Sequence, residues 1–401
     1  MTASDAPQPR RVHHVITRLI LGGAQENTVS SVLGLARMPE FSLRLISGPT
    51  TGSEGSIVDQ VSGTPGLLTV TPHLIRRVHP LLDWFAYRDL TRLFRDEQPH
   101  IVHTHSGKAG ILGRLAARKA GVPIILHTIH GPSFGRFQGG LANAVFTRAE
   151  RFAARCTDHF VVVANAMAQQ YQDAGIGRPE DYTRVFSGFD LEPFLNSRPD
   201  PDLAASLGIK PGDFVLGKIA RLFALKGHED LFLALPELVR RVPRLKLLLL
   251  GDGPWRQRFE SEARASGFAD RVIFAGLVPP SQVGRHIALM DAVAHLSRRE
   301  GLARVLPQSL ACGKPIVAYD CDGASEVCID GETGFLIAPD DLNALVNRVG
   351  QLADAPELAQ DLGQQGRGFV TDRFPTQRMV DDLAWLYREW LKRKGILGSA
   401  P

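Results

Sequence analysis

The sequence predicts an α/β protein with two doubly wound parallel-sheet domains. The chain has 401 residues, a length that fits two domains better than one. Apolar runs of strand length alternate with stretches of helix length in both halves, which is the pattern of parallel sheets covered by helices on both faces. A polar, proline-containing stretch around residue 200 interrupts this alternation and divides the chain near its middle.

These observations set the expected domain boundaries. We place the first domain at residues 11–197 and the second at residues 205–374, with a linker between them. Residues 375–396 contain an amphipathic helix, Gln377–Lys394, which we expect to cross back and cap the first domain. Residues 1–10 are short, polar and proline-containing, and we expect them to form a disordered tail.

The first domain shows the alternation less cleanly than the second. Its expected strands are Val12–Ile16, Leu43–Ser47, Ile101–His103, Ile124–Thr128 and His159–Val163. Its expected helices are Gln25–Ala36, Leu81–Phe94, Lys108–Ala120, Gly140–Ala154 and Ala166–Tyr171.

The apolar runs of the second domain contain fewer polar residues than those of the first domain. Its expected strands are Phe214–Ile219, Leu245–Leu250, Val272–Phe274, Ala292–Leu296, Ile316–Tyr319 and Phe335–Ile337. The helices expected between them include His228–Arg241, Pro254–Ser266 and Ser281–Met290. Because such domains bind ligands at the carboxyl ends of their strands, we expect the ligand-binding residues in the loops that follow these strands.

The composition is that of a globular protein of the cytoplasm. Apolar residues make up 44% and charged residues 22% of the chain, which allows a sizeable core. The four cysteines form no CxxC pair, so we expect free thiols. No apolar run is long enough to span a bilayer, and the first ten residues lack the apolar centre of a signal peptide.

The net charge of +4 is carried by residues 1–200. A mildly basic first domain suits an anionic membrane surface or an acidic ligand, and ordinary surface charge fits as well. Residues 137–155 mix phenylalanine and leucine with arginine, which fits a helix lying on the inner face of a membrane or a helix with one buried face. We expect no nucleic-acid partner, because no arginine-rich cluster has interleaved aromatic residues.

Two loops of the second domain contain candidate ligand groups. Arg221 and Lys226 follow the first strand. A guanidinium offers a planar fork and an ammonium a point charge, a combination that suits a diphosphate, although solvated surface cations would look the same. Gly251 and Gly253 follow the next strand, where a plain strand-to-helix turn and a ligand contact both fit.

The stretch R-R-E-G-L-A-R-V-L-P-Q-S-L-A-C-G-K-P, residues 298–315, is the most informative segment. Glu300 precedes an expected helix that begins near Arg304 and ends at Gly313. The N-terminal amides of such a helix favour a phosphate. Gln308 lies in the first turns and can both donate and accept. A carboxylate before the helix and an amide inside it fit a nucleotide sugar, which has hydroxyls at both ends and a diphosphate in the middle.

The order of these motifs resembles a known family. R-x4-K-G, G-D-G-P, E-G-x6-Q-x3-C-G-K-P and D-G-x2-E follow one another as in the retaining glycosyltransferases of family 4, also called glycosyl transferases group 1. L-I-L-G-G-A-Q, T-I-H-G and S-G-F-D-L-E-P-F resemble the family's glycine-rich first loop, its first-domain histidine and the segment before the linker. The resemblance runs from about residue 12 to residue 390. It implies the GT-B fold, with two Rossmann-like domains facing a central cleft and a C-terminal helix that crosses back.

The resemblance implies a role for each matching residue. Arg221 and Lys226 would bind the donor diphosphate and stabilise charge on the leaving group. Glu300 would hold hydroxyls of the donor sugar, and His130 would touch the transferred sugar near the reacting centre. The implied donor-binding positions are Gly22, Gly23, Gly251, Gly253, Gly301, Leu302, Ala303 and Gln308.

The implied activity is retaining, metal-independent transfer of a hexosyl group from a nucleotide-diphosphate sugar to a hydroxyl acceptor. The acceptor would be a carbohydrate or a lipid-linked molecule, in polysaccharide or glycolipid assembly. The resemblance implies no cofactor and no metal. The implied partners are the donor, the acceptor and an anionic membrane that the first domain touches.

The sequence departs from the family's pattern at two positions, and other functions are therefore also considered. Gln308 stands where the family usually has glutamate, and Ala220 stands where a glycine often precedes the first cation. An amide can still serve two ribose hydroxyls, and alanine fits if its φ is negative. These departures motivate a non-catalytic GT-B-type partner subunit as one alternative. A sugar-nucleotide epimerase is another, but it needs clustered first-domain carboxylates, which Asp83, Glu97 and Asp190 do not supply by sequence.

Two patterns suggest a metal, and we set both aside. Asp320-Cys321-Asp322 matches the DxD pattern of metal-dependent glycosyltransferases of another fold, but it lies in a loop that needs no metal in the GT-B pattern. His103 and His105, with His127 and His130, suggest zinc. We take His103 and His105 to point to opposite sides of their strand, which is poor geometry for one ion.

Overall fold

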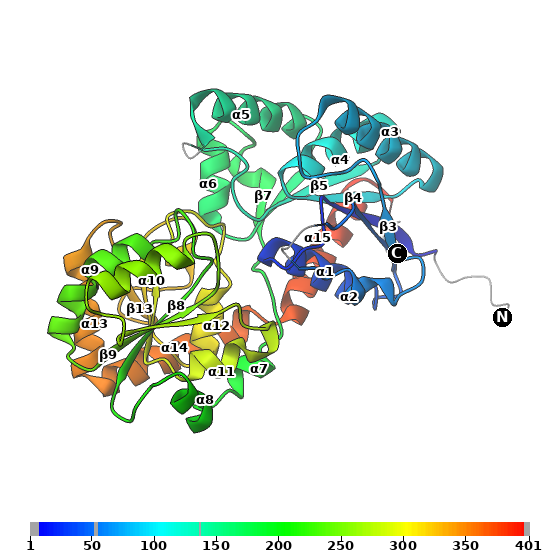
Figure 1. The fold of residues 1–401 in the computed structure, drawn as a ribbon. Helices are drawn as coiled ribbons and strands as arrows, with labels where there is room; N and C mark the ends of the chain where they lie inside the picture. The colour runs from blue at the N-terminus through cyan, green and yellow to red at the C-terminus, as the bar shows by residue number, and fades with distance from the viewer. Residues whose placement is uncertain (1–7, 52–54, 136–137, 397–401) are drawn as a thin grey trace, which may run out of the picture. The chain divides into compact units, whose positions relative to one another are not determined.

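The computed structural model divides into two compact units, each built on one parallel sheet (Figure 1). The residues it describes are 8–51, 55–135 and 138–396. The first unit runs to Phe189 and resumes at Thr376, and the second is Asp190–Pro375. The predicted fold class is therefore confirmed. The predicted tail falls largely on residues 1–7, which lie outside the described ranges.

The sheet of the first unit has the strand order β3-β2-β1-β4-β5-β6-β7, and all neighbouring strands pair in parallel. The strands are β1 (Arg10–Ile16), β2 (Phe41–Ser47), β3 (Leu68–Val70), β4 (Ile101–His105), β5 (Ile124–Ile129), β6 (His159–Val162) and β7 (Tyr182–Arg184). The chain order reverses between β1 and β4, and parallel sheets bind ligands at such a switch point. The two edge strands, β3 and β7, were not predicted.

Helices cover both faces of this sheet. They are α1 (Gly23–Leu35), α2 (Asp59–Ser62), α3 (Pro80–Glu97), α4 (Gly107–Ala120), α5 (Gly140–Ala154), α6 (Asn165–Asp173) and α15 (Thr376–Arg393). Val15 and Val102 pack with α3 and α4 on one face. Val12 and Ile101 pack with α1 and α15 on the other.

The C-terminal helix α15 returns to the first unit and packs beside α1, as predicted. An added Cβ on Gly34 of α1 would lie 2.3 Å from Val380 Cγ2, so α1 has no side chain where α15 crosses it. Met379 Sδ accepts from Asn27 Nδ2 at 3.1 Å and from the Gly188 amide at 3.3 Å. The helix is therefore tied both to α1 and to the last segment of the first unit.

The sheet of the second unit has the order β10-β9-β8-β11-β12-β13 and is also parallel. Its strands are β8 (Phe214–Ile219), β9 (Leu245–Leu250), β10 (Val272–Gly276), β11 (Ala292–His295), β12 (Ile316–Tyr319) and β13 (Gly334–Ile337). The chain order reverses between β8 and β11, which makes the edge beyond these two strands the switch point of this unit.

The second unit has eight α-helices within the described ranges, of which the four longest contribute side chains to one apolar core. The eight helices are α7 (Glu192–Leu195), α8 (Pro201–Ser206), α9 (His228–Arg241), α10 (Arg256–Ala265), α11 (Val283–Ala288), α12 (Val305–Ala311), α13 (Leu342–Asp354) and α14 (Pro356–Arg373). The short helix α7 packs on α11 and α12, so the unit begins at Asp190, before the boundary placed at residue 197. The sequence did not predict the helices α13 and α14.

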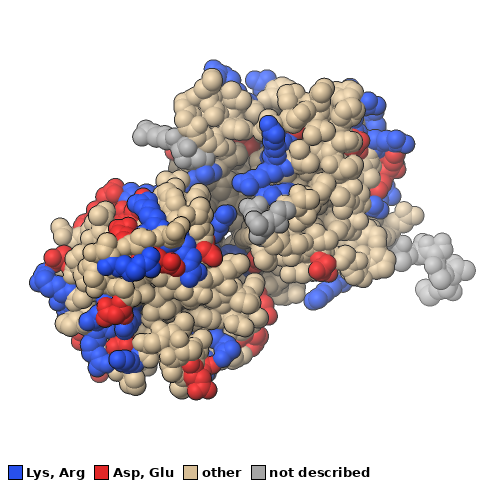
Figure 2. Space-filling view, viewed as in Figure 1, with Lys and Arg blue, Asp and Glu red and all other residues tan. Residues whose placement is uncertain are grey.

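Charge is distributed differently over the two units. Figure 2 shows Lys and Arg over the viewed face of the first unit with few Asp or Glu among them, and both signs mixed over the viewed face of the second. The first half of the sequence likewise carries the net positive charge. No helix within the described ranges has the length and apolarity to cross a bilayer.

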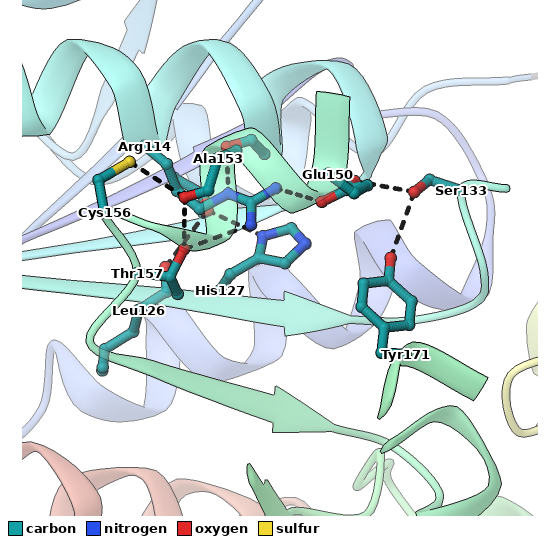
Figure 3. A network of polar contacts seen from close by, with 11 residues as sticks. Arg114, Leu126, His127, Ser133, Glu150, Ala153, Cys156, Thr157 and Tyr171 are labelled. Carbon is teal, nitrogen blue, oxygen red and sulfur yellow. Dashed lines mark hydrogen bonds and ion pairs between the residues drawn. The ribbon is translucent and has the colours of Figure 1, made fainter. Parts of the chain in front are cut away.

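A buried ion pair lies beneath the loop that follows β5 (Figure 3). Arg114 of α4 and Glu150 of α5 are fully buried, with Arg114 Nη2 2.6 Å from Glu150 Oε2. The Ser133 hydroxyl, in the loop, donates to Glu150 Oε1 at 2.8 Å and lies 3.2 Å from the Tyr171 hydroxyl. Arg114 Nε donates to the Gly110 carbonyl at 2.8 Å. The network therefore fixes this loop to two helices.

Glu150→Ala should lower the free energy of unfolding by roughly 3–5 kcal/mol, because it leaves a buried guanidinium without its partner. Faster amide hydrogen exchange in α4 and α5 of the full chain measures the loss. Glu237→Ala is the control, since it breaks an exposed pair with Arg240 on α9 and should change nothing measurable. Arg114→Met combined with Glu150→Leu should recover most of the stability. Unchanged exchange in Glu150→Ala would contradict a structural role for the pair.

Candidate functional site

The loops after β8 and β11 touch at the switch point of the second sheet. Their strands are neighbours, and the Arg298 amide donates to the Leu225 carbonyl at 2.8 Å. Gly227 has a φ of 68°, and an added Cβ there would lie 2.0 Å from the Leu296 carbonyl oxygen. Only glycine fits where the two backbones approach so closely.

Lys226 and Glu300 form an ion pair at this edge. Lys226 Nζ and the Ser297 hydroxyl both donate to Glu300 Oε1, the hydroxyl at 3.0 Å. The Glu300 amide donates to Asp322 Oδ2 at 2.7 Å. The family resemblance implies that Lys226 binds the phosphate and Glu300 separately holds the sugar. The structure joins them into one cluster, in which Lys226 and Ser297 donate to the Glu300 carboxylate and Asp322 accepts from the Glu300 backbone amide.

Gly251 and Gly253 lie against the loop that carries Arg221. An added Cβ would lie 2.1 Å from the Ala220 carbonyl oxygen at Gly251, and 2.5 Å from the Leu222 carbonyl oxygen at Gly253. Close backbone packing therefore requires both glycines, whether or not they also touch a ligand.

Arg221 is exposed, and its guanidinium carbon lies 5.6 Å from the centroid of the Phe223 ring. The residue before it, Ala220, keeps a negative φ, which is the condition for a harmless alanine. Within the described ranges, positive φ at residues other than glycine occurs at Gln98, Ser106, Leu225, Asp322 and Asp340.

The predicted helix after Glu300 is α12. Gly301 and Leu302 are buried and Ala303 is half-buried just before its start, where the first amides of a helix have no intrahelical partner. Gln308 lies in the middle of the helix and is half-buried. Gly313, with a φ of 71°, follows the end of α12, as the Gly-Lys-Pro sequence predicts.

A lysine that the sequence analysis missed lies in β8. Lys218 is 1% exposed, and burial together with the nearby Lys226 ammonium lowers its pKa to about 7. Asp230 and Glu300 act in the opposite direction on this pKa. Burial also lowers the pKa of His295 to about 3. The signal that could have found this group is a lysine inside an apolar strand, V-L-G-K-I.

At the switch point of the first sheet, Gly22 and Gly23 lie where α1 begins. The φ of Gly22 is 173°, an extended value that any residue adopts. An added Cβ there would meet only the flexible end of the Gln25 side chain, at 2.8 Å. Across the switch point, the Thr17 and Ser106 hydroxyls are 3.0 Å apart.

His130 follows the end of β5 and belongs to a histidine cluster. Its Nε2 lies 3.1 Å from His105 Nδ1, and burial lowers the pKa of His130 to about 4. The prediction that His103 and His105 point to opposite sides of their strand is wrong. Residues two apart in a strand share a face, and these two rings have centroids 4.6 Å apart. Among the described residues, His14, His103 and His105 are the group whose geometry could hold a metal ion.

Of the other candidate carboxylates, Asp322 lies beside Glu300 at the switch point of the second sheet. Asp322 holds the Glu300 amide, and the metal-capable group within the described ranges includes neither Asp320 nor Asp322. In the first unit, Asp83 pairs with a lysine of α4 and Glu97 with an arginine of β2. Asp83 and Glu97 therefore lack the clustering that an epimerase needs.

Two family models match this chain. Residues 200–369 match the model described as glycosyl transferases group 1, and residues 22–187 match the model described as glycosyl transferase 4-like domain. The two matches fall on the second and first units, respectively.

Known proteins resemble the chain over most of its length. It is 31% identical over 277 residues to the GDP-mannose-dependent alpha-(1-6)-phosphatidylinositol monomannoside mannosyltransferase of Mycolicibacterium smegmatis, covering 66% of this chain and 69% of that one. It is 25% identical over 396 residues to the UDP-Gal:alpha-D-GlcNAc-diphosphoundecaprenol alpha-1,3-galactosyltransferase of Escherichia coli, covering 96% and 98%. The crystal structure of Anabaena HepE in complex with UDP-glucose has the same fold, with a TM-score of 0.78 at 20% identity, covering 94% and 99%.

The sequence, the fold and these comparisons agree. Two parallel-sheet, Rossmann-like units with a returning C-terminal helix form the GT-B fold. The chain belongs to the glycosyl transferases group 1, the family-4 glycosyltransferases, and is a nucleotide-sugar-dependent hexosyltransferase.

Proposed function

We propose that this glycosyltransferase acts with retention and without a metal, and moves a hexosyl group to a hydroxyl acceptor in polysaccharide or glycolipid assembly. The observation that carries the proposal is the cluster of Lys226, Glu300 and Ser297 at the switch point of the second sheet. It offers a cation for a phosphate and a fixed carboxylate for sugar hydroxyls. Arg221, on the same loop as Lys226, adds a second cation.

The proposed chemistry breaks the bond between the anomeric carbon and the donor phosphate. Arg221 and Lys226 would stabilise the negative charge that develops on the departing diphosphate. The ammonium of Lys226 has three N–H groups, so it can serve Glu300 and a phosphate together. The acceptor oxygen would attack from the face that the phosphate leaves, and a phosphate oxygen would take the acceptor proton. Retention then needs no enzymic nucleophile, in keeping with the absence of clustered carboxylates at the residues considered.

The proposed donor is a UDP- or GDP-hexose. The two relatives above are named for UDP-Gal and GDP-mannose, and the HepE structure holds UDP-glucose. Both contacts of the Glu300 side chain fall on Oε1, so Oε2 would accept from a sugar hydroxyl. Gln308 would hold the ribose, with its carbonyl accepting from one hydroxyl and its amide donating to the other.

We also propose that the first unit touches an anionic membrane through α5. Leu141, Val145 and Phe152 are 83%, 55% and 57% exposed, and their spacing places them on one face of the helix. Arg148 lies in the same stripe. An exposed apolar stripe with arginines suits a lipid interface, and the two relatives named above act on lipid-linked sugars by name. The free thiols support a cytoplasmic location.

Arg221→Ala and Lys226→Ala should each lower kcat by about 10²–10³-fold, because each removes charge stabilisation of the leaving diphosphate. Transfer assays with the matching nucleotide sugar measure this. Arg240→Ala is the control, since Arg240 is an exposed arginine of α9 and should not affect turnover. EDTA should leave activity unchanged. Activity that EDTA abolishes and Mn²⁺ restores would overturn metal independence, and near-normal turnover in both variants would overturn the site.

One nucleotide family should raise the melting temperature of the full chain, because a ligand that binds only the folded state stabilises it by mass action. UDP, GDP, ADP and their hexose conjugates are the ligands to screen. The additional rise that the hexose gives should disappear in Glu300→Ala, while the rise from the nucleotide remains. Glu332→Ala, an exposed glutamate near β13, should behave as wild type. Equal hexose increments in wild type and Glu300→Ala would remove Glu300 from the sugar site.

Replacing Leu141 and Phe152 together by serine should lower binding to anionic vesicles about tenfold or more, since both side chains would lose burial in lipid. Co-sedimentation with phosphatidylglycerol-containing vesicles measures it. Leu233→Ser is the matched control, because Leu233 is 67% exposed on α9 of the second unit. Equal binding by wild type and the double variant, or no difference between anionic and neutral vesicles, would contradict the role of α5.

A further inference from the structure

A row of buried polar side chains connects the returning helix α15 to His130. Residues 12 and 14 of β1, 101, 103 and 105 of β4, and 126 and 128 of β5 alternate onto the sheet face that α15 covers. His14 and His103 are register partners on neighbouring strands. Their side chains and that of Tyr387 on α15 are fully buried, and His105 is 1% exposed.

Five contacts join these groups end to end. Thr128 Oγ1 lies 2.6 Å from His103 Nε2, and His103 Nδ1 lies 2.6 Å from the Tyr387 hydroxyl. The Tyr387 hydroxyl lies 3.0 Å from His14 Nε2, and His14 Nδ1 lies 2.9 Å from His105 Nε2. His105 Nδ1 lies 3.1 Å from His130 Nε2. We call this series, from Thr128 to His130, the histidine chain.

Each group of the histidine chain is neutral. Burial lowers the pKa of His14 to about 3 and that of His130 to about 4, and holds the pKa values of His103 and His105 well below their ordinary range. Burial raises the pKa of Tyr387 well above its ordinary value. A neutral imidazole has one N–H donor and one acceptor nitrogen, and a hydroxyl has one proton.

The Tyr387 hydroxyl can also accept from both His103 and His14, but its own buried proton then has no contact in this series. When that proton is used, two arrangements fill all five contacts. In one, Thr128 donates to His103, and each group donates to the next as far as His130. In the other, His130 donates to His105, and every contact is reversed. The atoms in contact require all four histidines to carry the proton on Nδ1 in the first arrangement and on Nε2 in the second. The four tautomers are therefore linked through the Tyr387 hydroxyl.

We propose that Tyr387 is a positioning residue, which fixes the ring orientation and tautomer of His130 through the histidine chain and so sets how His130 meets a sugar hydroxyl. The contact between His130 and the sugar rests on the proposed function. The linkage of the tautomers rests on the contacts alone. In this arrangement the C-terminal helix contributes to the site through the core of the first unit.

A metal ion held by His14, His103 and His105 would use the same nitrogens differently. A metal takes a nitrogen lone pair from each ring, whereas the contacts of the histidine chain direct these nitrogens at one another and at Tyr387. The rings of His14 and His105 are nearly parallel, at 14°, and meet nitrogen to nitrogen. This geometry is that of an imidazole–imidazole hydrogen bond.

Nitrogen NMR of the full chain with ¹⁵N-labelled histidine tests the linkage without any substrate. The signals of His14, His103, His105 and His130, assigned by single substitutions, should all report the same neutral tautomer. Tyr387→Phe should abolish this agreement, and Tyr182→Phe should preserve it, because the Tyr182 hydroxyl donates instead to the Ile176 carbonyl. Mixed tautomers in the wild type would overturn the proposal. One equivalent of zinc in the purified protein would overturn it as well.

Kinetics then test whether the linkage serves the reaction. Tyr387→Phe should lower kcat about tenfold, the lower end of what removing a partner that fixes a histidine costs in metal sites. The same substitution should have no further effect in a His130→Gln background. Thr128→Val, at the far end of the chain, should act in the same direction and covers the case in which Tyr387→Phe fails to fold. Additive effects of Tyr387→Phe and His130→Gln would overturn the positioning role. A protein that transfers no sugar but shows matched tautomers would instead refute the proposed function.

Discussion

All strands within each unit run parallel, and this constraint decides where chemistry can occur. Their carboxyl ends collect at one edge of each sheet, and the single reversal of chain order brings two loops together there. Lys226 and Glu300 lie 74 residues apart in sequence and still form an ion pair for this reason. The close approach of the loops excludes a Cβ at Gly227 and Gly251, so the glycines that frame the site are required by packing before any ligand is considered.

The first unit depends in addition on a helix from the far end of the chain. Its sheet buries polar side chains on the face that α15 covers, and buried polar groups must find hydrogen-bond partners. The Tyr387 hydroxyl contacts both His103 and His14, and Met379 accepts from the side chain of Asn27. The helix α15 therefore covers this face of the sheet with apolar side chains and also provides hydrogen-bond partners for the polar side chains buried there.

The sequence predicted most of the fold, because apolar runs and helix signals are local. Phe214–Ile219 and Leu245–Leu250 are strands with the predicted ends. The strands Leu68–Val70 and Tyr182–Arg184 escaped prediction because three residues are too few to show the apolar run of a longer strand. The histidine chain also escaped. Its members come from three strands, the loop after β5 and α15, so only the folded chain brings them together. The two β4 histidines were also predicted to lie on opposite faces, although residues two apart in a strand share a face. Likewise, the sequence around Arg114 or Glu150 does not indicate that either charge is buried. Each charge is stabilised by the other, which lies on a different helix.

The two strand edges differ in charge in the way the proposed reaction requires. The edge of the second sheet carries Arg221, Lys226 and Glu300, which suit a diphosphate and the hydroxyls of a sugar. The edge of the first sheet carries His130, which burial keeps neutral. A neutral imidazole can donate to a hydroxyl or accept from one without adding charge beside a developing positive centre. If His130 meets the transferred sugar as proposed, a charged imidazole would oppose an anomeric carbon that loses its phosphate, so the burial that lowers the pKa of His130 suits the proposed chemistry.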